Sequence, residues 1–161
     1  KASRLETGIF AMDPQVHGVQ RLLDAVLIQG QHKARERGLS LTAEPTFAQA
    51  RFDEKWTAEA LYNLVDNALK YTPQGGKVAL SVREFELFCA IQVEDNGPGI
   101  PEGEQGAIFG RFYRGEAVRD QEGLGIGLYL AREVVTREGG YIRLNSSPGQ
   151  GSRFSLYLPK E

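Results

Sequence analysis

Apolar residues recur at helical spacing in three long stretches of the chain. The pattern predicts helices over residues 19–37, 53–71 and 125–138. Asp53 provides an N-cap for the second of these helices, and Thr72-Pro73 ends it. Two shorter helical segments are expected, one at residues 1–8 as the last turns of a helix and one near residues 102–108.

Shorter runs that alternate or stay apolar, bounded by turn residues, indicate strands. They are residues 9–16, 39–43, 48–52, 77–84, 87–94, 141–145 and 153–158. The last two are joined by Ser147-Pro-Gly-Gln-Gly151, a sequence that favours a tight turn. Because helices are interleaved with pairs of antiparallel strands, we expect a two-layer α/β sandwich.

Length and composition narrow the class of protein. The chain has 161 residues, the length of one domain, and its net charge of -2 lacks the basic excess of a nucleic-acid-binding surface. Its single cysteine, Cys89, lies in an apolar run, so we expect a buried and unreactive thiol. No apolar run approaches the roughly 18 residues that span a bilayer. The chain begins at Lys1 in mid-pattern, and we interpret it as part of a longer protein.

The helix expected at residues 53–71 carries a polar stripe. Glu59, Asn63, Asn67 and Lys70 fall on one side of it, because each residue of a helix advances by about 100°. A solvated face would explain one such stripe, but asparagine is a poor residue for a helix interior and two aligned asparagines need a reason. Amide oxygens can bind a Mg²⁺ ion that bridges phosphates, and a lysine one turn further could reach those phosphates.

Two glycine-rich segments are further candidates for ligand contact. Residues 95–99 (Asp-Asn-Gly-Pro-Gly) follow an apolar strand, where a carboxylate can accept a hydrogen bond from an amine such as that of adenine. Residues 123–127 (Gly-Leu-Gly-Ile-Gly) lead into a helix, whose first amides and dipole bind anions. A capped turn and a plain flexible loop are the alternatives, and the second spacing matches neither a P-loop nor a dinucleotide-binding turn.

Aromatic and arginine side chains alternate in residues 108–115 (Ile-Phe-Gly-Arg-Phe-Tyr-Arg-Gly). Arg111 and Arg114 could contact phosphate, and Phe109 could anchor a mobile lid or a partner surface. A purely packing role for Phe109 and Phe112 is an equal alternative.

Taken together, in this order and spacing, the four segments resemble the nucleotide-binding sequence boxes of the catalytic domain of bacterial sensor histidine kinases. The resemblance covers about residues 39–159 and extends to the wider group of gyrase, chaperone and mismatch-repair ATPases. It implies the Bergerat-type ATP-binding fold, a two-layer sandwich whose mixed, mostly antiparallel sheet carries about three helices on one face. Residues 9–161 would form this domain, and residues 1–8 the end of the preceding dimerisation helix.

The resemblance also implies roles for individual residues, with ATP and Mg²⁺ as cofactors. Asn63 and Asn67 would hold the metal, Lys70 would meet a phosphate, and Asp95 would accept from the adenine amino group. The implied catalytic residues are Glu59, Asn63, Lys70 and Arg114. The implied nucleotide contacts are Asn63, Asn67, Lys70, Tyr71, Asp95, Gly97, Gly99, Ile100, Phe109, Arg111, Gly123, Leu124, Gly125, Ile126 and Gly127.

The phosphoacceptor histidine of that family lies on a separate dimerisation domain, and neither His17 nor His32 matches its motif. The resemblance therefore implies a domain that transfers the γ-phosphate of ATP to a partner-domain histidine, for relay to a response regulator. The full protein would be a membrane-bound homodimer with this domain in the cytoplasm, and the fragment alone a monomer without self-phosphorylation. A clamp-forming ATPase, a nucleotide-binding module without catalysis and an anti-sigma serine kinase are the alternatives.

Overall fold

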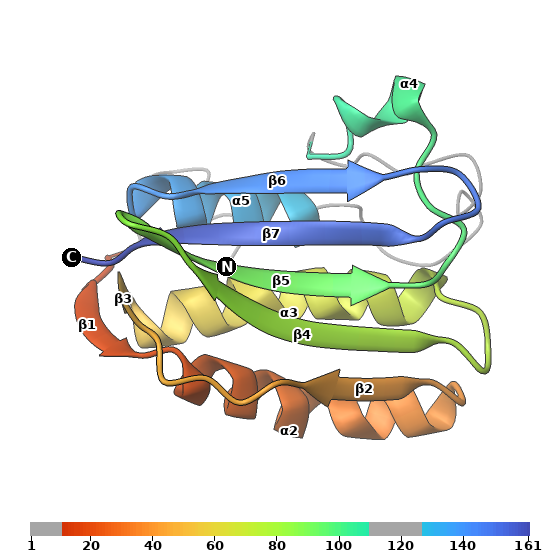
Figure 1. The fold of residues 1–161 in the computed structure, drawn as a ribbon, viewed down its shortest axis with the longest axis horizontal. Coiled ribbons are helices and arrows are strands. Elements are labelled where there is room, and N and C mark those ends of the chain that lie inside the picture. Colours follow the sequence, from red (N-terminus) through yellow and green to blue (C-terminus); the bar gives the residue numbers. More distant parts are fainter. Residues whose placement is uncertain (1–10, 110–126) are drawn as a thin grey trace.

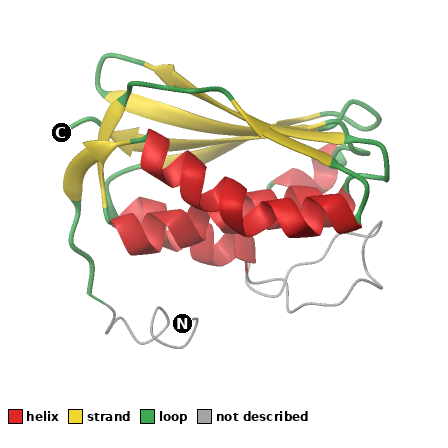
Figure 2. Cartoon of the chain, turned by 90° about the horizontal axis from the view of Figure 1, so that it is seen from below, coloured by secondary structure: helices red, strands yellow, loops and turns green. Residues whose placement is uncertain are grey.

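The computed structural model describes residues 11–109 and 127–161, which form two layers (Figure 1). One layer is a sheet and the other consists of helices that cover one of its faces (Figure 2). The covering helices are α2 (Gln20–Glu36), α3 (Glu54–Tyr71) and α5 (Gly127–Arg137). The short helix α4 (Glu102–Gln105) lies beyond the β6 edge of the sheet (Figure 1). The strands are β1 (Gln15–Gly18), β2 (Ser40–Ala43), β3 (Gln49–Phe52), β4 (Lys77–Glu84), β5 (Phe88–Asp95), β6 (Tyr141–Ser146) and β7 (Ser152–Pro159).

The main sheet has the strand order β2-β4-β5-β7-β6 (Figure 1). β2 and β4 are parallel, and every other neighbouring pair is antiparallel. A parallel pair needs a crossover, and the chain makes it through β3 and α3. β1 and β3 form a separate antiparallel pair. The expected fold class, a mixed and mostly antiparallel sheet with helices on one face, is confirmed.

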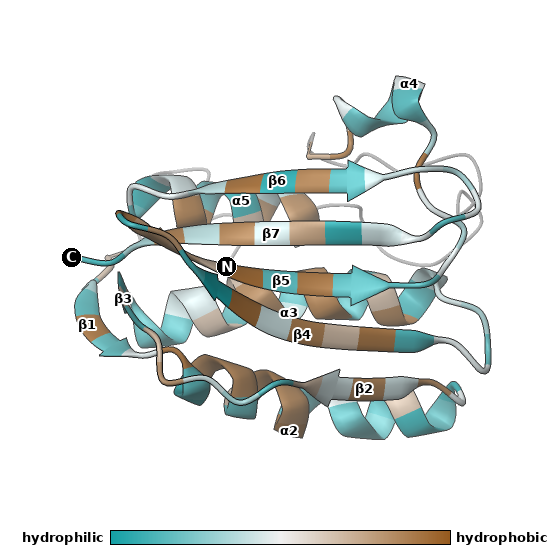
Figure 3. Ribbon diagram, viewed as in Figure 1, coloured by the Kyte–Doolittle hydropathy of each residue, from teal (hydrophilic) through white to brown (hydrophobic). Residues whose placement is uncertain are grey.

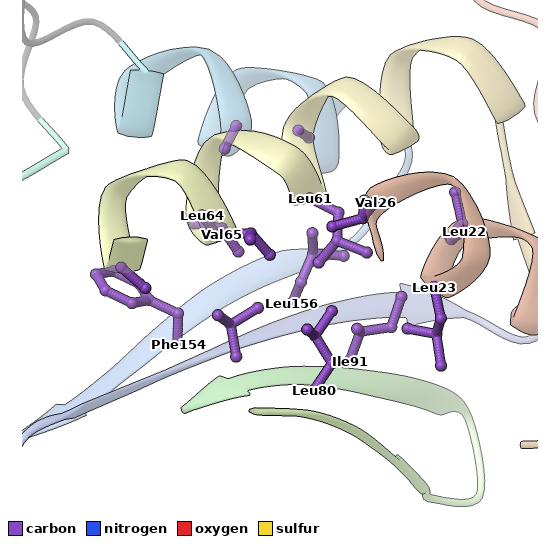
Figure 4. Packing of buried hydrophobic residues seen from close by; sticks show 14 of the residues in the cluster. Leu22, Leu23, Val26, Leu61, Leu64, Val65, Leu80, Ile91, Phe154 and Leu156 are labelled. Carbon is purple, nitrogen blue, oxygen red and sulfur yellow. The ribbon is translucent and has the colours of Figure 1, made fainter. Parts of the chain in front are cut away.

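The core lies between the sheet and helices α2, α3 and α5. Hydropathy alternates along the central strands (Figure 3), because one face of each strand meets the helices and the other does not. The inward residues of β4, β5 and β7 pack against apolar residues of α2 and α3 (Figure 4). The fully buried members drawn there include Leu22, Leu23, Leu61, Leu64, Val65, Leu80, Ile91 and Leu156. Each large side chain of this kind stabilises the fold by about 1.5–3 kcal/mol through burial.

Most expected elements form close to their predicted bounds, and the clearest error is the first strand. It was expected at residues 9–16, whereas β1 runs from Gln15 to Gly18. β1 is confined to the four residues that pair with β3, and Pro14, just before it, has no N–H for a strand ladder. The helix predicted near residues 102–108 is also shorter, at Glu102–Gln105. The helical segment expected at residues 1–8 lies outside the described residues.

Cys89 is fully buried in β5, and burial raises the pKa of its thiol to about 11. The thiolate is the reactive form, so the expectation of a buried, unreactive cysteine agrees with its position. Within residues 11–109 and 127–161, no helix is long and apolar enough to cross a membrane.

Candidate nucleotide-binding site

Helix α3 carries the polar stripe because its opposite face is buried. Asp53 caps the helix as expected, and its Oδ1 accepts a hydrogen bond from the Trp56 backbone N at 2.8 Å. The buried face consists of Trp56, Thr57, Ala60, Leu61, Leu64, Val65, Ala68 and Leu69. Glu59, Asn63, Asn67 and Lys70 are all half-buried. They lie on the other side, as the sequence predicted.

The start of α5 lies directly against this stripe. A Cβ atom placed on Gly127 would be 3.8 Å from both Cβ and Cγ of Asn63. The N-terminal end of a helix carries a partial positive charge and favours anions. The structure therefore brings together two segments that are 64 positions apart in the sequence. This proximity agrees with the expectation that Gly127 and Asn63 belong to one nucleotide site. Gly123, Leu124, Gly125 and Ile126 lie outside the described residues, and so do Arg111 and Arg114.

Lys70 belongs to a charged cluster that sequence reasoning did not find. Its Nζ is 3.3 Å from Asp66 Oδ2, while Asp66 Oδ1 accepts a hydrogen bond from Lys33 Nζ at 2.5 Å. The bond to Asp66 is also the main reason that the pKa of Lys33 is raised. Arg37 donates to the backbone oxygen of Lys70 at 3.1 Å. Helical spacing predicts the contact between Asp66 and Lys70, but Lys33 comes from another helix and gave no signal in the sequence.

Asp95 ends β5 and its carboxylate is held in place by backbone. The Gly97 N–H donates to Asp95 Oδ1 at 2.9 Å. Burial raises the pKa of Asp95, and the hydrogen bonds from the backbones of Gly97 and Ser152 partly offset that effect. A partly desolvated carboxylate makes stronger hydrogen bonds than one in water. Asp95 can therefore accept firmly from a ligand donor.

The glycines after Asp95 fit the loop onto the β6–β7 turn. Gly99 has φ +78°, and a Cβ there would lie only 2.1 Å from the backbone oxygen of Ser147. Gly151 faces the loop in the same way, because its Cβ would lie 2.1 Å from the Asp95 backbone oxygen. These contacts explain why glycine is needed at both positions. The family resemblance implied that Gly99 contacts the nucleotide base, and this contact stays a prediction.

Thr72, the residue after α3, was missed because the sequence treated it only as a helix stop. It is 5% exposed, and its Oγ1 is buried without a hydrogen-bond partner in the part of the chain that the structure describes. A Cβ on Gly97 would lie 3.4 Å from this oxygen and 3.0 Å from Asp95 Oδ1. Thr72 therefore adjoins the Asp95 loop.

The other predicted nucleotide contacts differ in how deeply they are buried and in what they pack against. Tyr71 is the half-buried last residue of α3. Ile100 packs against the core, and its backbone N donates to Ser146 Oγ at 2.8 Å. Phe109 meets Phe154 edge-on with ring centroids 6.1 Å apart, so the structure shows the packing role that the sequence left open.

The stripe on α3 offers the kind of oxygen ligand that a magnesium ion takes. The described residues contain no group of three or more His, Cys, Asp or Glu that could hold a metal. Mg²⁺ keeps several waters and takes few protein ligands when it is bound together with phosphates. The amide oxygens of Asn63 and Asn67 suit that kind of site.

Comparison with known proteins decides which class of nucleotide-binding protein this is. The family described as histidine kinase-, DNA gyrase B-, and HSP90-like ATPase matches residues 52–161, from the end of β3 to beyond β7. The chain belongs to this family. The family uses nucleotide, in agreement with the ATP site inferred from the sequence.

Individual relatives place the chain among the histidine kinases. Sensor protein kinase PmrB of Pseudomonas aeruginosa is 35% identical over 153 residues, 93% of this chain and 32% of that protein. Adaptive-response sensory kinase SasA of a Synechococcus strain is 45% identical over 102 residues, 63% of this chain and 27% of that protein. The solved structure of the mycobacterial sensor histidine kinase MprB superposes with a TM-score of 0.80 at 27% identity, over 90% of this chain and 97% of that one.

The resemblance drawn from the four sequence boxes is thus confirmed: this is the ATP-binding catalytic domain of a histidine kinase. The chain spans no more than about a third of the length of the curated relatives named here.

Proposed function

We propose that this domain binds Mg-ATP and presents the γ-phosphate to a histidine on a separate dimerisation domain of the same sensor kinase. The phosphate would then pass to a response regulator in two-component signalling. The observation that carries the proposal is that Gly127 lies beside Asn63, where a Cβ on Gly127 would come within 3.8 Å of the Asn63 side chain. It brings the positive end of α5 and the amide stripe of α3 to one place, which suits an anion with its metal ion.

The phosphate end of the site uses the stripe and its neighbours. Asn63 and Asn67 offer amide oxygens to Mg²⁺, which when bound neutralises charge on the phosphates. Lys70 lies 3.3 Å from Asp66 and turns from it to a phosphate. When Lys70 moves away, Lys33 still donates to Asp66, so the Asp66 carboxylate keeps one charged partner. Glu59, one turn before Asn63, orients a water molecule or the acceptor.

Residues outside the described part complete the phosphate end in this proposal. Arg111 and Arg114 contact the γ-phosphate, and the glycines of residues 123–125 border the phosphates. Leu124 and Ile126, next to these glycines in the sequence, are further nucleotide contacts in this proposal. Arginine is suited to this role because its planar group donates two parallel hydrogen bonds to phosphate oxygens.

The base end of the site is formed by Asp95 and its loop. Asp95 accepts from the adenine amino group, with its carboxylate fixed by the Gly97 N–H. Tyr71 lies against the ring, and Gly97, Gly99 and Ile100 shape the pocket. Guanine carries an oxygen where adenine carries its amino group, so a carboxylate at this point favours adenine.

The acceptor is placed on another domain because neither histidine of this chain matches the acceptor motif of the family. His17 packs on the Phe52 ring at 5.1 Å and lies 3.4 Å from Glu54 on the first turn of α3. His32 is exposed on α2 beside Glu36. A partner histidine nitrogen attacks the γ-phosphorus, the bond to the β,γ-bridging oxygen breaks, and ADP leaves. The protein's part is positioning and charge stabilisation.

The test mixes this domain with the separately expressed acceptor domain of the same protein and labelled ATP. Acid-labile label is expected on the acceptor only when both parts and Mg²⁺ are present. Asn63→Ala should abolish labelling, whereas Asn145→Ala, an exposed asparagine on β6, should not. Rapid labelling of the domain alone, on His17 or His32, would refute the proposal. Steady ATP hydrolysis without acceptor labelling would favour a clamp-forming ATPase.

We further propose that the full-length protein is a membrane-anchored homodimer with this domain in the cytoplasm, and that residues 1–8 end its dimerisation helix. Support comes from the relatives, which are named as sensor kinases and are more than twice as long as this chain. Light scattering of the isolated domain should give the mass of a monomer. A dimer of the domain alone would show that dimerisation does not depend on the preceding region.

A further inference from the structure

Thr72 holds a buried hydroxyl for which the fold itself supplies no partner. The side chain is 5% exposed, and Oγ1 makes no hydrogen bond within residues 11–109 and 127–161. A buried hydroxyl without a partner costs about 1–3 kcal/mol. Valine has nearly the same shape and would avoid that cost. A hydroxyl at this position therefore calls for a partner that the protein meets in another state.

The local geometry fixes where this hydroxyl points. Thr72 caps the C-terminus of α3, and its backbone N–H donates to Ala68 O at 3.0 Å. Its Cγ2 methyl faces Gly76, since a Cβ on Gly76 would lie 2.4 Å from it. Oγ1 lies near Gly97 instead, 3.4 Å from the position of a Cβ on that residue. The hydroxyl is thus aimed at the loop that fixes Asp95.

Asp95 and Thr72 converge on one small region. The position of a Cβ on Gly97 lies 3.0 Å from Asp95 Oδ1 and 3.4 Å from Thr72 Oγ1. The two oxygens therefore border the same point of the loop, Gly97. A side chain at Gly97 would crowd both oxygens, and glycine avoids this.

We propose that Thr72 is a positioning residue of the base site, where its hydroxyl donates a hydrogen bond to the ring nitrogen beside the adenine amino group, directly or through one water. The inference rests on the proposed function. It adds Thr72, for which the family resemblance implied no contact with the nucleotide. The amino group donates to Asp95 and the neighbouring ring nitrogen accepts from Thr72. The two protein groups together then hold the base edge at two points.

The test measures binding of ATP, 1-deaza-ATP and inorganic tripolyphosphate, each with Mg²⁺, by calorimetry. In the wild type, 1-deaza-ATP, which has a C–H in place of the ring nitrogen, should bind roughly five- to tenfold more weakly than ATP. Thr72→Val should weaken ATP by a similar factor, bind 1-deaza-ATP as the wild type does, and leave tripolyphosphate unchanged. Thr72→Ser should restore ATP binding, because it keeps the hydroxyl.

Several outcomes would overturn the inference. Equal affinity of the wild type for ATP and 1-deaza-ATP would do so without any variant. Retained ATP affinity in Thr72→Val, or equal weakening of ATP and tripolyphosphate, would also exclude a contact with the base. Failure of Thr72→Ser to restore binding would assign the residue to packing. If the wild type itself does not bind Mg-ATP, the proposed function fails, which is distinct from failure of this contact.

Discussion

Glu138 joins the C-terminal end of α5 to the start of α3 through a buried carboxylate. Its Oε2 accepts from the Asp53 backbone N at 2.7 Å and from Thr57 Oγ1 at 2.5 Å. The side chain is 9% exposed. Burial raises the pKa of Glu138 from 4.5 to about 7, the charge of Asp53 adds to this, and the two hydrogen bonds partly offset it. Glu138 is therefore protonated in the folded protein at pH values where it is ionised in the unfolded chain.

The sign of the pH dependence follows from this difference. Between pH 4.5 and about 7 the folded state binds a proton that the unfolded state has lost, so ionisation of Glu138 makes the folded protein less stable as pH rises. Each unit of pKa difference is worth about 1.4 kcal/mol. Between pH 5 and pH 8 the loss from this group is about 2–3 kcal/mol. Glu138→Gln keeps the size and the acceptor oxygen but cannot ionise, so the variant should lack this loss.

The assay is urea unfolding of the wild type and Glu138→Gln at pH 5 and pH 8, followed by far-ultraviolet circular dichroism. Relative to the wild type, the variant should gain about 2–3 kcal/mol on going from pH 5 to pH 8. Glu133→Gln, a half-buried position on α5, serves as the control for the loss of one glutamate charge. If the free-energy difference between Glu138→Gln and wild type is the same at both pH values, the raised pKa is wrong.

Three further predictions concern the loops and the core. Gly99→Ala should destabilise the fold by more than about 2 kcal/mol in urea unfolding, because φ is +78° and the new Cβ would clash with the backbone. Gly103→Ala is the control and should not destabilise the fold in this way, because its Cβ would meet nothing within 4 Å. Equal stability of the two variants would contradict the packing of the Asp95 loop on the β6–β7 turn. Leu64→Ala should cost about 2–5 kcal/mol and Ile28→Ala, which is 80% exposed, little in the same assay. Cys89 should react with a thiol reagent at pH 8 only after unfolding, and rapid reaction of the folded protein would show that the thiol is accessible.

The fold could be predicted in large part because its helices and strands have clear periodicity. α3 shows this best: the Asp53 cap, the apolar face and the end at Tyr71 are all local properties of the sequence. The prediction of the first strand was wrong because this strand lacks such a local pattern. Its position depends on pairing with β3, a long-range contact that local pattern does not encode.

The candidate site was predictable where one element carries it, and less so where elements meet. The stripe of Asn63 and Asn67 follows from helical geometry alone. The partners of Lys70 do not, because Lys33 comes from α2 and shares Asp66 only in the folded structure. The role of Thr72 could not be predicted for a similar reason, because its hydroxyl lies near Asp95 only in the folded structure.

The central claim is that the amide stripe of α3, together with the start of α5, binds a magnesium-bound nucleotide. Titration of ATP into the wild type, Asn63→Ala and Asn145→Ala, each with and without Mg²⁺, tests it most directly. Mg²⁺ should strengthen ATP binding by the wild type and by Asn145→Ala, and Asn63→Ala should lose that gain. An undiminished gain from Mg²⁺ in Asn63→Ala would contradict the account.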